Sequence, residues 1–164
     1  MDLFIIRHAW AAQRDDSAYS DDSLRPLTDE GRSRFARMVG ALVIRGLTPQ
    51  LILTSPMLRC VQTAEILATA LGKKSKVLQE KELLPGTDPK HLLAATEEHA
   101  GGLDQVAWVG HAPDVGYLVA ALIGLDNGWL DLKKGAIAAL GFPGSPELGR
   151  GELRWLVTAK ILGV

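Results

Sequence analysis

The stretch LFIIRHAW, residues 3–10, decides the fold class of this 164-residue chain. The four apolar residues from Leu3 to Ile6 are typical of a strand that is buried on both faces, as strands of parallel sheets are. Arg7 and His8 follow directly, so a guanidinium and an imidazole are predicted at the carboxyl end of this strand. The stretch therefore favours an α/β protein in which one edge of the sheet carries polar groups.

Further apolar runs alternate with helical patterns along the chain, and this alternation predicts a mostly parallel sheet in a single domain over residues 1–164. The expected strands are Leu51–Thr54 and Val106–Val109, a weaker one at 76–79, and two further ones at 136–142 and 153–158. Helices are expected after the caps Thr28 and Asp88 and over the apolar set that follows residue 114. Another helix is expected to start at Ser55 as cap, with Pro56 in its first position.

Charged or imidazole side chains follow three of these strands. Arg7 and His8 follow the first, Arg59 lies one helical turn beyond Ser55, and His111 comes two residues after Val109. If the strands are parallel neighbours, the four side chains converge in the crevice where open α/β sheets bind ligands. Two guanidiniums suit phosphate oxygens, and a histidine beside them can act as nucleophile, acid or base. The pattern indicates a phosphate pocket with a reactive histidine.

Other phosphate chemistries fit the sequence less well. It has no P-loop motif, and the single cysteine, Cys60, is expected inside a helix and not at the head of a phosphate-binding loop. The arginines around His8 would repel a divalent cation, so we expect no metal and no other cofactor. The acidic residues Asp15, Asp16, Asp21 and Asp22 are read as a solvated loop.

Three motifs in order, RH at the first strand, SPMLRCVQTAE (residues 55–65) and VGHAPDV (residues 109–115), resemble the histidine phosphatase superfamily, also called phosphoglycerate-mutase-like. The ending LRWLVTAKIL is most similar to the SixA branch of phosphohistidine phosphatases. The resemblance implies a three-layer α/β/α sandwich. It also implies that His8 is the nucleophile, that Arg7 and Arg59 hold the phosphoryl oxygens, and that His111 donates a hydrogen bond to them.

Two positions stand apart from these motifs. Trp10 occupies a place that is often charged in the family, and we read it as a packing anchor for its loop, with a platform for the substrate as the alternative. Glu82 is the best-placed candidate for a general acid. It stays outside the predicted catalytic set, because the labile P–N bond of phosphohistidine makes a dedicated acid dispensable.

The leading functional hypothesis is dephosphorylation of phosphohistidine on a protein, for example on a histidine-containing phosphotransfer domain. The alternatives are a phosphomonoesterase for a small metabolite and a catalytically silent phosphate-binding module. The net charge of −1 offers no argument for binding nucleic acid or an anionic membrane. One cysteine, no signal peptide and no membrane-length apolar run favour a soluble protein of the cytoplasm.

Overall fold

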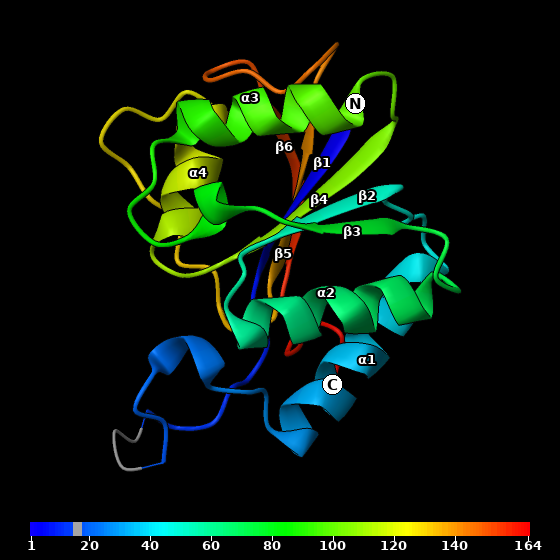
Figure 1. Cartoon of the computed structure of the whole chain (residues 1–164). Coiled ribbons are helices and arrows are strands. Elements are labelled where there is room, and N and C mark those ends of the chain that lie inside the picture. The colour runs from blue at the N-terminus through cyan, green and yellow to red at the C-terminus, as the bar shows by residue number, and fades with distance from the viewer. Residues whose placement is uncertain (15–17) are drawn as a thin grey trace.

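The computed structural model describes residues 1–14 and 18–164 (Figure 1). Its strands are β1 (Asp2–Arg7), β2 (Leu51–Thr54), β3 (Lys76–Gln79), β4 (Gln105–Gly110), β5 (Ile137–Gly141) and β6 (Glu152–Val157). Its α-helices are α1 (Asp29–Val43), α2 (Leu58–Ala70), α3 (Pro89–Ala100) and α4 (Asp114–Leu122). The short 3₁₀ helices η1 (Asp22–Leu24) and η2 (Lys81–Leu83) were not predicted from the sequence.

The strands form one six-stranded sheet in the order β3-β2-β4-β1-β5-β6. The pairs β3–β2, β2–β4 and β4–β1 are parallel, whereas β1–β5 and β5–β6 are antiparallel. The mostly parallel sheet is therefore confirmed. The three strands that precede the candidate residues, β2, β4 and β1, are adjacent, so their carboxyl ends meet at one edge.

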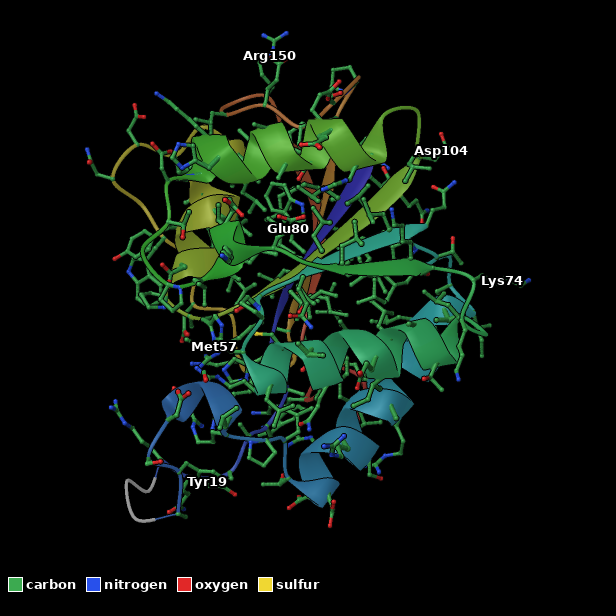
Figure 2. All side chains as sticks on the ribbon, viewed as in Figure 1. Tyr19, Met57, Lys74, Glu80, Asp104 and Arg150 are labelled. Atoms are coloured by element: carbon green, nitrogen blue, oxygen red, sulfur yellow. The ribbon has the colours of Figure 1, made fainter. Side chains whose placement is uncertain are left out.

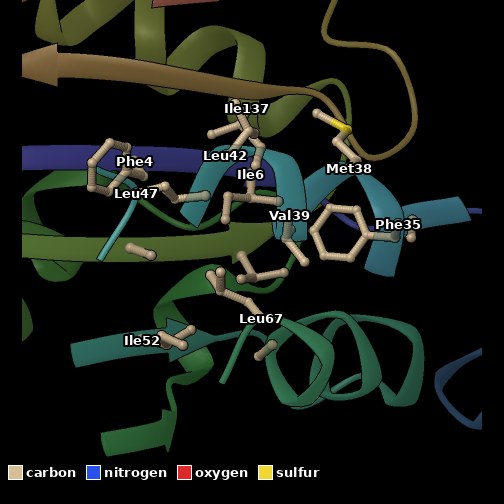
Figure 3. Close-up of a cluster of buried hydrophobic side chains, with 14 of the residues drawn as sticks. Phe4, Ile6, Phe35, Met38, Val39, Leu42, Leu47, Ile52, Leu67 and Ile137 are labelled. Atoms are coloured by element: carbon tan, nitrogen blue, oxygen red, sulfur yellow. The ribbon is translucent and has the colours of Figure 1, made fainter. Parts of the chain in front are cut away.

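Helices cover both faces of this sheet and complete the predicted three-layer sandwich (Figure 1). Alternate residues of β1 face opposite sides, as the period of a strand requires. Phe4 and Ile6 belong to the buried cluster under α1 and α2, part of which Figure 3 shows. Leu3 and Ile5 belong to the cluster under α3 and α4. A strand buried on both faces is what the unbroken apolar run predicted.

The start of α1 is fixed by its cap and by one close contact. The Thr28 side chain accepts a hydrogen bond from the main-chain N–H of Gly31, which confirms the predicted cap. Thr28 N–H in turn donates to the carbonyl oxygen of Trp10. A Cβ at Gly31 would lie 2.2 Å from that oxygen, so only glycine lets α1 approach the loop after β1 this closely.

The predicted start of α2 was wrong. The helix begins at Leu58 with Met57 as its cap residue, and neither Ser55 nor Pro56 is helical. The reason is that the Ser55 hydroxyl lies 2.9 Å from Nε2 of His111 and is engaged there, whereas its distance from the Met57 N–H is 3.4 Å. Within the described residues, no helix has the length and apolar character that crossing a membrane requires.

Candidate active site

The structure brings all four predicted residues together at the carboxyl ends of β1, β4 and β2. Arg7 ends β1 and lies opposite Gly110 of β4, and the main-chain N–H of His8 donates to the Gly110 carbonyl at 3.0 Å. The rings of His8 and His111 are 5.4 Å apart between centroids. The residues His8, Arg59 and His111 are buried, with 8%, 5% and 4% of their surface exposed.

One nitrogen of His8 is left free for chemistry. Nδ1 lies 2.7 Å from the carbonyl oxygen of Ala9, and because a carbonyl only accepts, Nδ1 carries the proton. Nε2 therefore keeps its lone pair. Burial, with smaller contributions from His111, Arg59 and Arg7, lowers the pKa of His8 to about 3. The neutral form expected from the sequence is therefore favoured near pH 7, although burial outweighs the neighbouring cations as its cause.

Each arginine uses its terminal nitrogens to hold its own position. Arg7 Nη1 donates to the carbonyl oxygen of Leu132 at 2.7 Å, and Arg59 Nη1 donates to that of Asp22 at 2.8 Å. Among the described residues, the Nε atoms of both arginines are buried and have no hydrogen-bond partner. Leaving a buried donor unpaired costs about 1–3 kcal/mol, so each of these N–H groups fits an acceptor oxygen that a ligand would supply.

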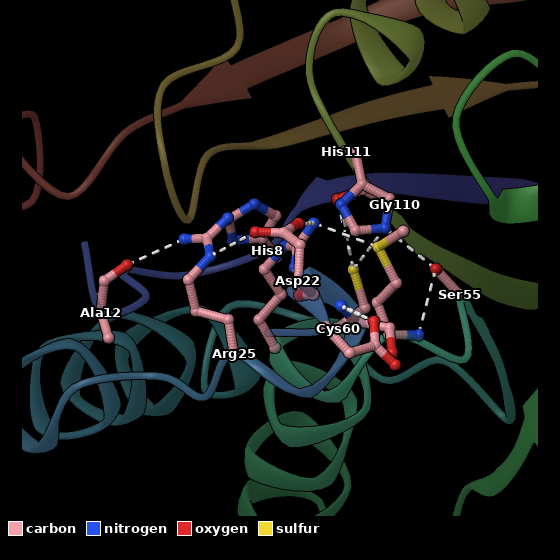
Figure 4. A network of polar contacts seen from close by, with 12 residues as sticks. His8, Ala12, Asp22, Arg25, Ser55, Cys60, Gly110 and His111 are labelled. Carbon is pink, nitrogen blue, oxygen red and sulfur yellow. Dashed lines mark hydrogen bonds and ion pairs between the residues drawn. The ribbon is translucent and has the colours of Figure 1, made fainter. Parts of the chain in front are cut away.

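His111 is held by Ser55 and Cys60 (Figure 4). The Cys60 Sγ lies 3.4 Å from Nε2 of His111 and donates to the carbonyl oxygen of Gly110 at 3.6 Å. Burial raises the pKa of the Cys60 thiol to about 12, so it is protonated at neutral pH and is not a nucleophile. Burial likewise lowers the pKa of His111 to about 4. In the free protein His111 is therefore a neutral imidazole.

Two residues of the SPMLRCVQTAE motif act where the sequence analysis assigned them no role. The Thr63 hydroxyl accepts from the Ala9 N–H at 3.0 Å and donates to the Arg59 carbonyl at 2.7 Å. It thereby ties the loop after β1 to the first turn of α2. The Gln62 side chain accepts from the Leu27 N–H at 2.8 Å and holds the segment that precedes α1. The motif thus positions Arg59 and both flanking segments.

Asp22 was also missed, because the sequence analysis placed it in a solvated loop. For Asp22 that prediction was incomplete: its side chain is 34% exposed, but its carboxylate also lies 3.1 Å from Nη2 of Arg59 and accepts from Nε of Arg25 at 2.8 Å (Figure 4). Hydrogen bonding to Arg25 lowers the pKa of this carboxyl. The spacing of Asp22 and Arg25 by three residues was the available signal. Asp21 is exposed and caps η1, whereas Asp15 and Asp16 lie outside the described residues.

The two remaining candidates, Glu82 and Trp10, line different cavities. Glu82 lines a cavity of about 200 Å³ together with His111 and Asp114. Trp10 packs against the core beneath α1, and the Arg34 guanidinium lies over its ring at 4.3 Å. These contacts agree with the packing anchor expected for Trp10.

Comparisons with known proteins agree with this geometry. Residues 3–84 match the sequence model of the histidine phosphatase superfamily (branch 1). The chain is 41% identical to an uncharacterised protein of Picosynechococcus sp. over 143 residues, covering 85% of this chain and 84% of the relative. It is 37% identical over 126 residues to the phosphohistidine phosphatase SixA of Escherichia coli, covering 74% of each.

A solved structure of the protein histidine phosphatase SixA in complex with tungstate superimposes with a TM-score of 0.84. The two sequences are 31% identical, and the alignment covers 99% of both chains. Family model, relative and structure all agree with the resemblance that the three motifs carry. The chain therefore belongs to the histidine phosphatase superfamily, branch 1, as a SixA-like phosphatase.

Proposed function

We propose that this protein removes the phosphoryl group from phosphohistidine on a protein, through a phosphohistidine intermediate on its own His8. One observation carries the proposal. The free Nε2 of a neutral, buried histidine lies in a site where Arg7 and Arg59 each have a buried Nε–H that finds no partner among residues 1–14 and 18–164. A nucleophile with donors for the oxygens around its target is what phosphoryl transfer asks of a protein.

In the first step, His8 Nε2 attacks phosphorus in line and the P–N bond of the substrate breaks. The substrate imidazole leaves with the electron pair of that bond. It departs neutral when its other ring nitrogen carries a proton, so no acid from the enzyme is required. The Nε–H groups of Arg7 and Arg59 and an N–H of His111 donate to the phosphoryl oxygens and stabilise the charge that they carry.

In the second step, water attacks the phosphoryl group on His8 and the new P–N bond breaks. Inorganic phosphate leaves, and Nε2 regains its lone pair. Both steps need only positioning and charge stabilisation, which Ser55 and Thr63 support through their contacts with His111 and Arg59. We therefore propose a reaction without metal or cofactor.

The proposal of a protein substrate draws on the relative, since the SixA protein of Escherichia coli is a phosphohistidine phosphatase by name. A histidine-containing phosphotransfer domain is the partner that we propose. The cytoplasmic location expected from the sequence stays a prediction.

The test compares kcat/KM for three substrates: a peptide with phosphohistidine, the same peptide with phosphoserine, and a sugar phosphate. We expect the phosphohistidine peptide to be preferred and His8→Ala to abolish its hydrolysis. The exposed His91→Ala is the matched control and keeps full activity. A preference for the sugar phosphate would contradict the proposal.

The position of Glu82 favours a second candidate function, hydrolysis of a small phosphate monoester. An alcohol leaves less readily than an imidazole and benefits from a general acid, and Glu82 lines the cavity beside His111. Glu82→Gln separates the two functions. It lowers the hydrolysis of esters if the second candidate is right, and it leaves the hydrolysis of phosphohistidine unchanged if the first is right.

A further inference from the structure

A second group of cations lies next to the phosphate site and shares Arg7 with it. Because β5 is antiparallel to β1 and β6 is antiparallel to β5, the loop before β5 and the segment after β6 lie at the same sheet edge as the end of β1. Both carry lysines. Together with α1 and the loop after β1 they enclose a cavity of about 420 Å³, here called the basic cavity, lined by Arg7, Trp10, Arg34, Lys133, Lys134 and Lys160.

This concentration of positive charge is local. The whole chain has 18 Lys and Arg against 19 Asp and Glu, so five cations around one cavity do not follow from composition. One opposing charge nearby is Asp131, which forms an ion pair with Lys133. Among the described residues, no hydrogen bond or ion pair is found for the side chains of Lys134 and Lys160. The cavity therefore presents cations that are available to an outside partner.

The form of the cavity favours an extended acidic ligand over a small anion. A small anion is usually held by fixed donors that converge on it, often in bidentate pairs. Here Arg34 is already engaged with the main-chain oxygen of Val164 and with the ring of Trp10. The three lysines are exposed and stand on two separate segments. Exposed cations of this kind attract and orient a charged surface more than they enclose a single group.

We propose that the basic cavity binds an acidic segment of the protein that presents the phosphohistidine, and so selects acidic substrates. This inference rests on the proposed function. Arg7 belongs to both sites: it precedes His8 at the end of β1, its buried Nε has no partner in the part of the chain that the structure describes, and its side chain lines the basic cavity. A protein bound through its carboxylates at the cavity would hold its phosphohistidine next to His8.

The test uses two synthetic peptides with one chemically phosphorylated histidine each, one flanked by Glu and its twin by Gln at the same positions. We expect kcat/KM of the native protein to be about tenfold higher for the acidic peptide at low salt, since each exposed ion pair contributes modestly. The preference should fall as salt screens the charges. It should disappear in the triple variant Lys133→Gln/Lys134→Gln/Lys160→Gln.

The matched control is Lys74→Gln/Lys76→Gln/Arg150→Gln, which removes the same charge elsewhere. Figure 2 shows Lys74 and Arg150 far from Met57, whose sulfur contacts Arg59. The control should keep the preference. Equal kcat/KM for the two peptides, or a preference that survives in the cavity variant, would overturn the proposal.

Binding of the unphosphorylated peptides, followed by fluorescence anisotropy, decides the inference even if neither phosphopeptide is hydrolysed. In that case the proposed function fails, while tighter binding of the acidic peptide that is lost in the cavity variant still supports the basic cavity. If the cavity variant loses affinity for inorganic pyrophosphate but not for the acidic peptide, the cavity binds a small anion and the proposal is wrong.

Discussion

The neutral state of buried His8 predicts a measurable dependence of stability on pH. The pKa of His8 in the folded protein is about 3, against an ordinary value of 6.5. On acidification the unfolded chain therefore binds the proton first, and the folded state loses stability as pH falls from about 6.5 toward about 3. Replacing His8 by Asn removes this contribution, because Asn does not titrate.

The size of the effect follows from proton linkage. Between about pH 7 and pH 5, the proton bound by an unfolded histidine of ordinary pKa costs the folded state about 2 kcal/mol when the folded pKa is near 3. The free energy of unfolding of His8→Asn, taken relative to that of the native protein, should therefore be about 2 kcal/mol higher at pH 5 than at pH 7. Any destabilisation of the variant by lost packing is the same at both pH values, so it cancels when the two free energies of unfolding are compared. His111, whose pKa is lowered to about 4, is present in both proteins and also cancels.

The assay is urea unfolding of both proteins at the two pH values, with linear extrapolation of the free energy of unfolding. The exposed His91→Asn serves as the matched control for the replacement of a histidine by Asn away from the site. If the difference between His8→Asn and the native protein were equal at both pH values, His8 would titrate like an exposed histidine. Burial would then not lower the pKa of His8.

Three further substitutions test how the site is held. Thr63→Val removes both hydrogen bonds of the hydroxyl that joins two site segments. It should lower the free energy of unfolding by about 1–3 kcal/mol and reduce kcat, whereas the exposed Thr69→Val in the same helix should leave kcat unchanged. Gly31→Ala places a Cβ against a carbonyl and should destabilise the protein by more than about 2 kcal/mol in urea unfolding. Gly40→Ala in the same helix meets no atom and should stabilise it slightly; equal effects would contradict the close-contact argument. Asp22→Asn removes a carboxylate that competes for Arg59, so inorganic phosphate should inhibit about threefold more strongly, and unchanged inhibition would argue against that competition.

The sheet and the convergence of the four site residues could be predicted because both follow from local pattern. The apolar runs mark the strands, and the strand ends place Arg7, His8 and His111. The start of α2 was mispredicted, because Ser55 has the chemistry of a cap and a tertiary contact with His111 uses its hydroxyl instead. Propensity describes a residue among its neighbours in sequence, and a partner far along the chain can override it.

The residues that support the site could not be predicted from the sequence for the same reason. Thr63 contacts Ala9, which is 54 positions away, and Asp22 contacts Arg59, which is 37 positions away. Neither contact produces a periodic pattern that could be recognised in a single sequence. The charge pattern of the loop around Asp22 is that of a solvated segment, and only the fold shows which carboxylate contacts Arg59.

The central claim is that His8 forms a covalent phosphohistidine, and trapping this intermediate tests it most directly. The protein is mixed with a phosphohistidine peptide, quenched within milliseconds in base, digested, and analysed by mass spectrometry. We predict an acid-labile phosphoryl group on the peptide that contains His8, and none in His8→Ala, with His91→Ala labelled as the native protein is. Hydrolysis of the substrate without any label on His8, or with the label on another residue, would contradict the account.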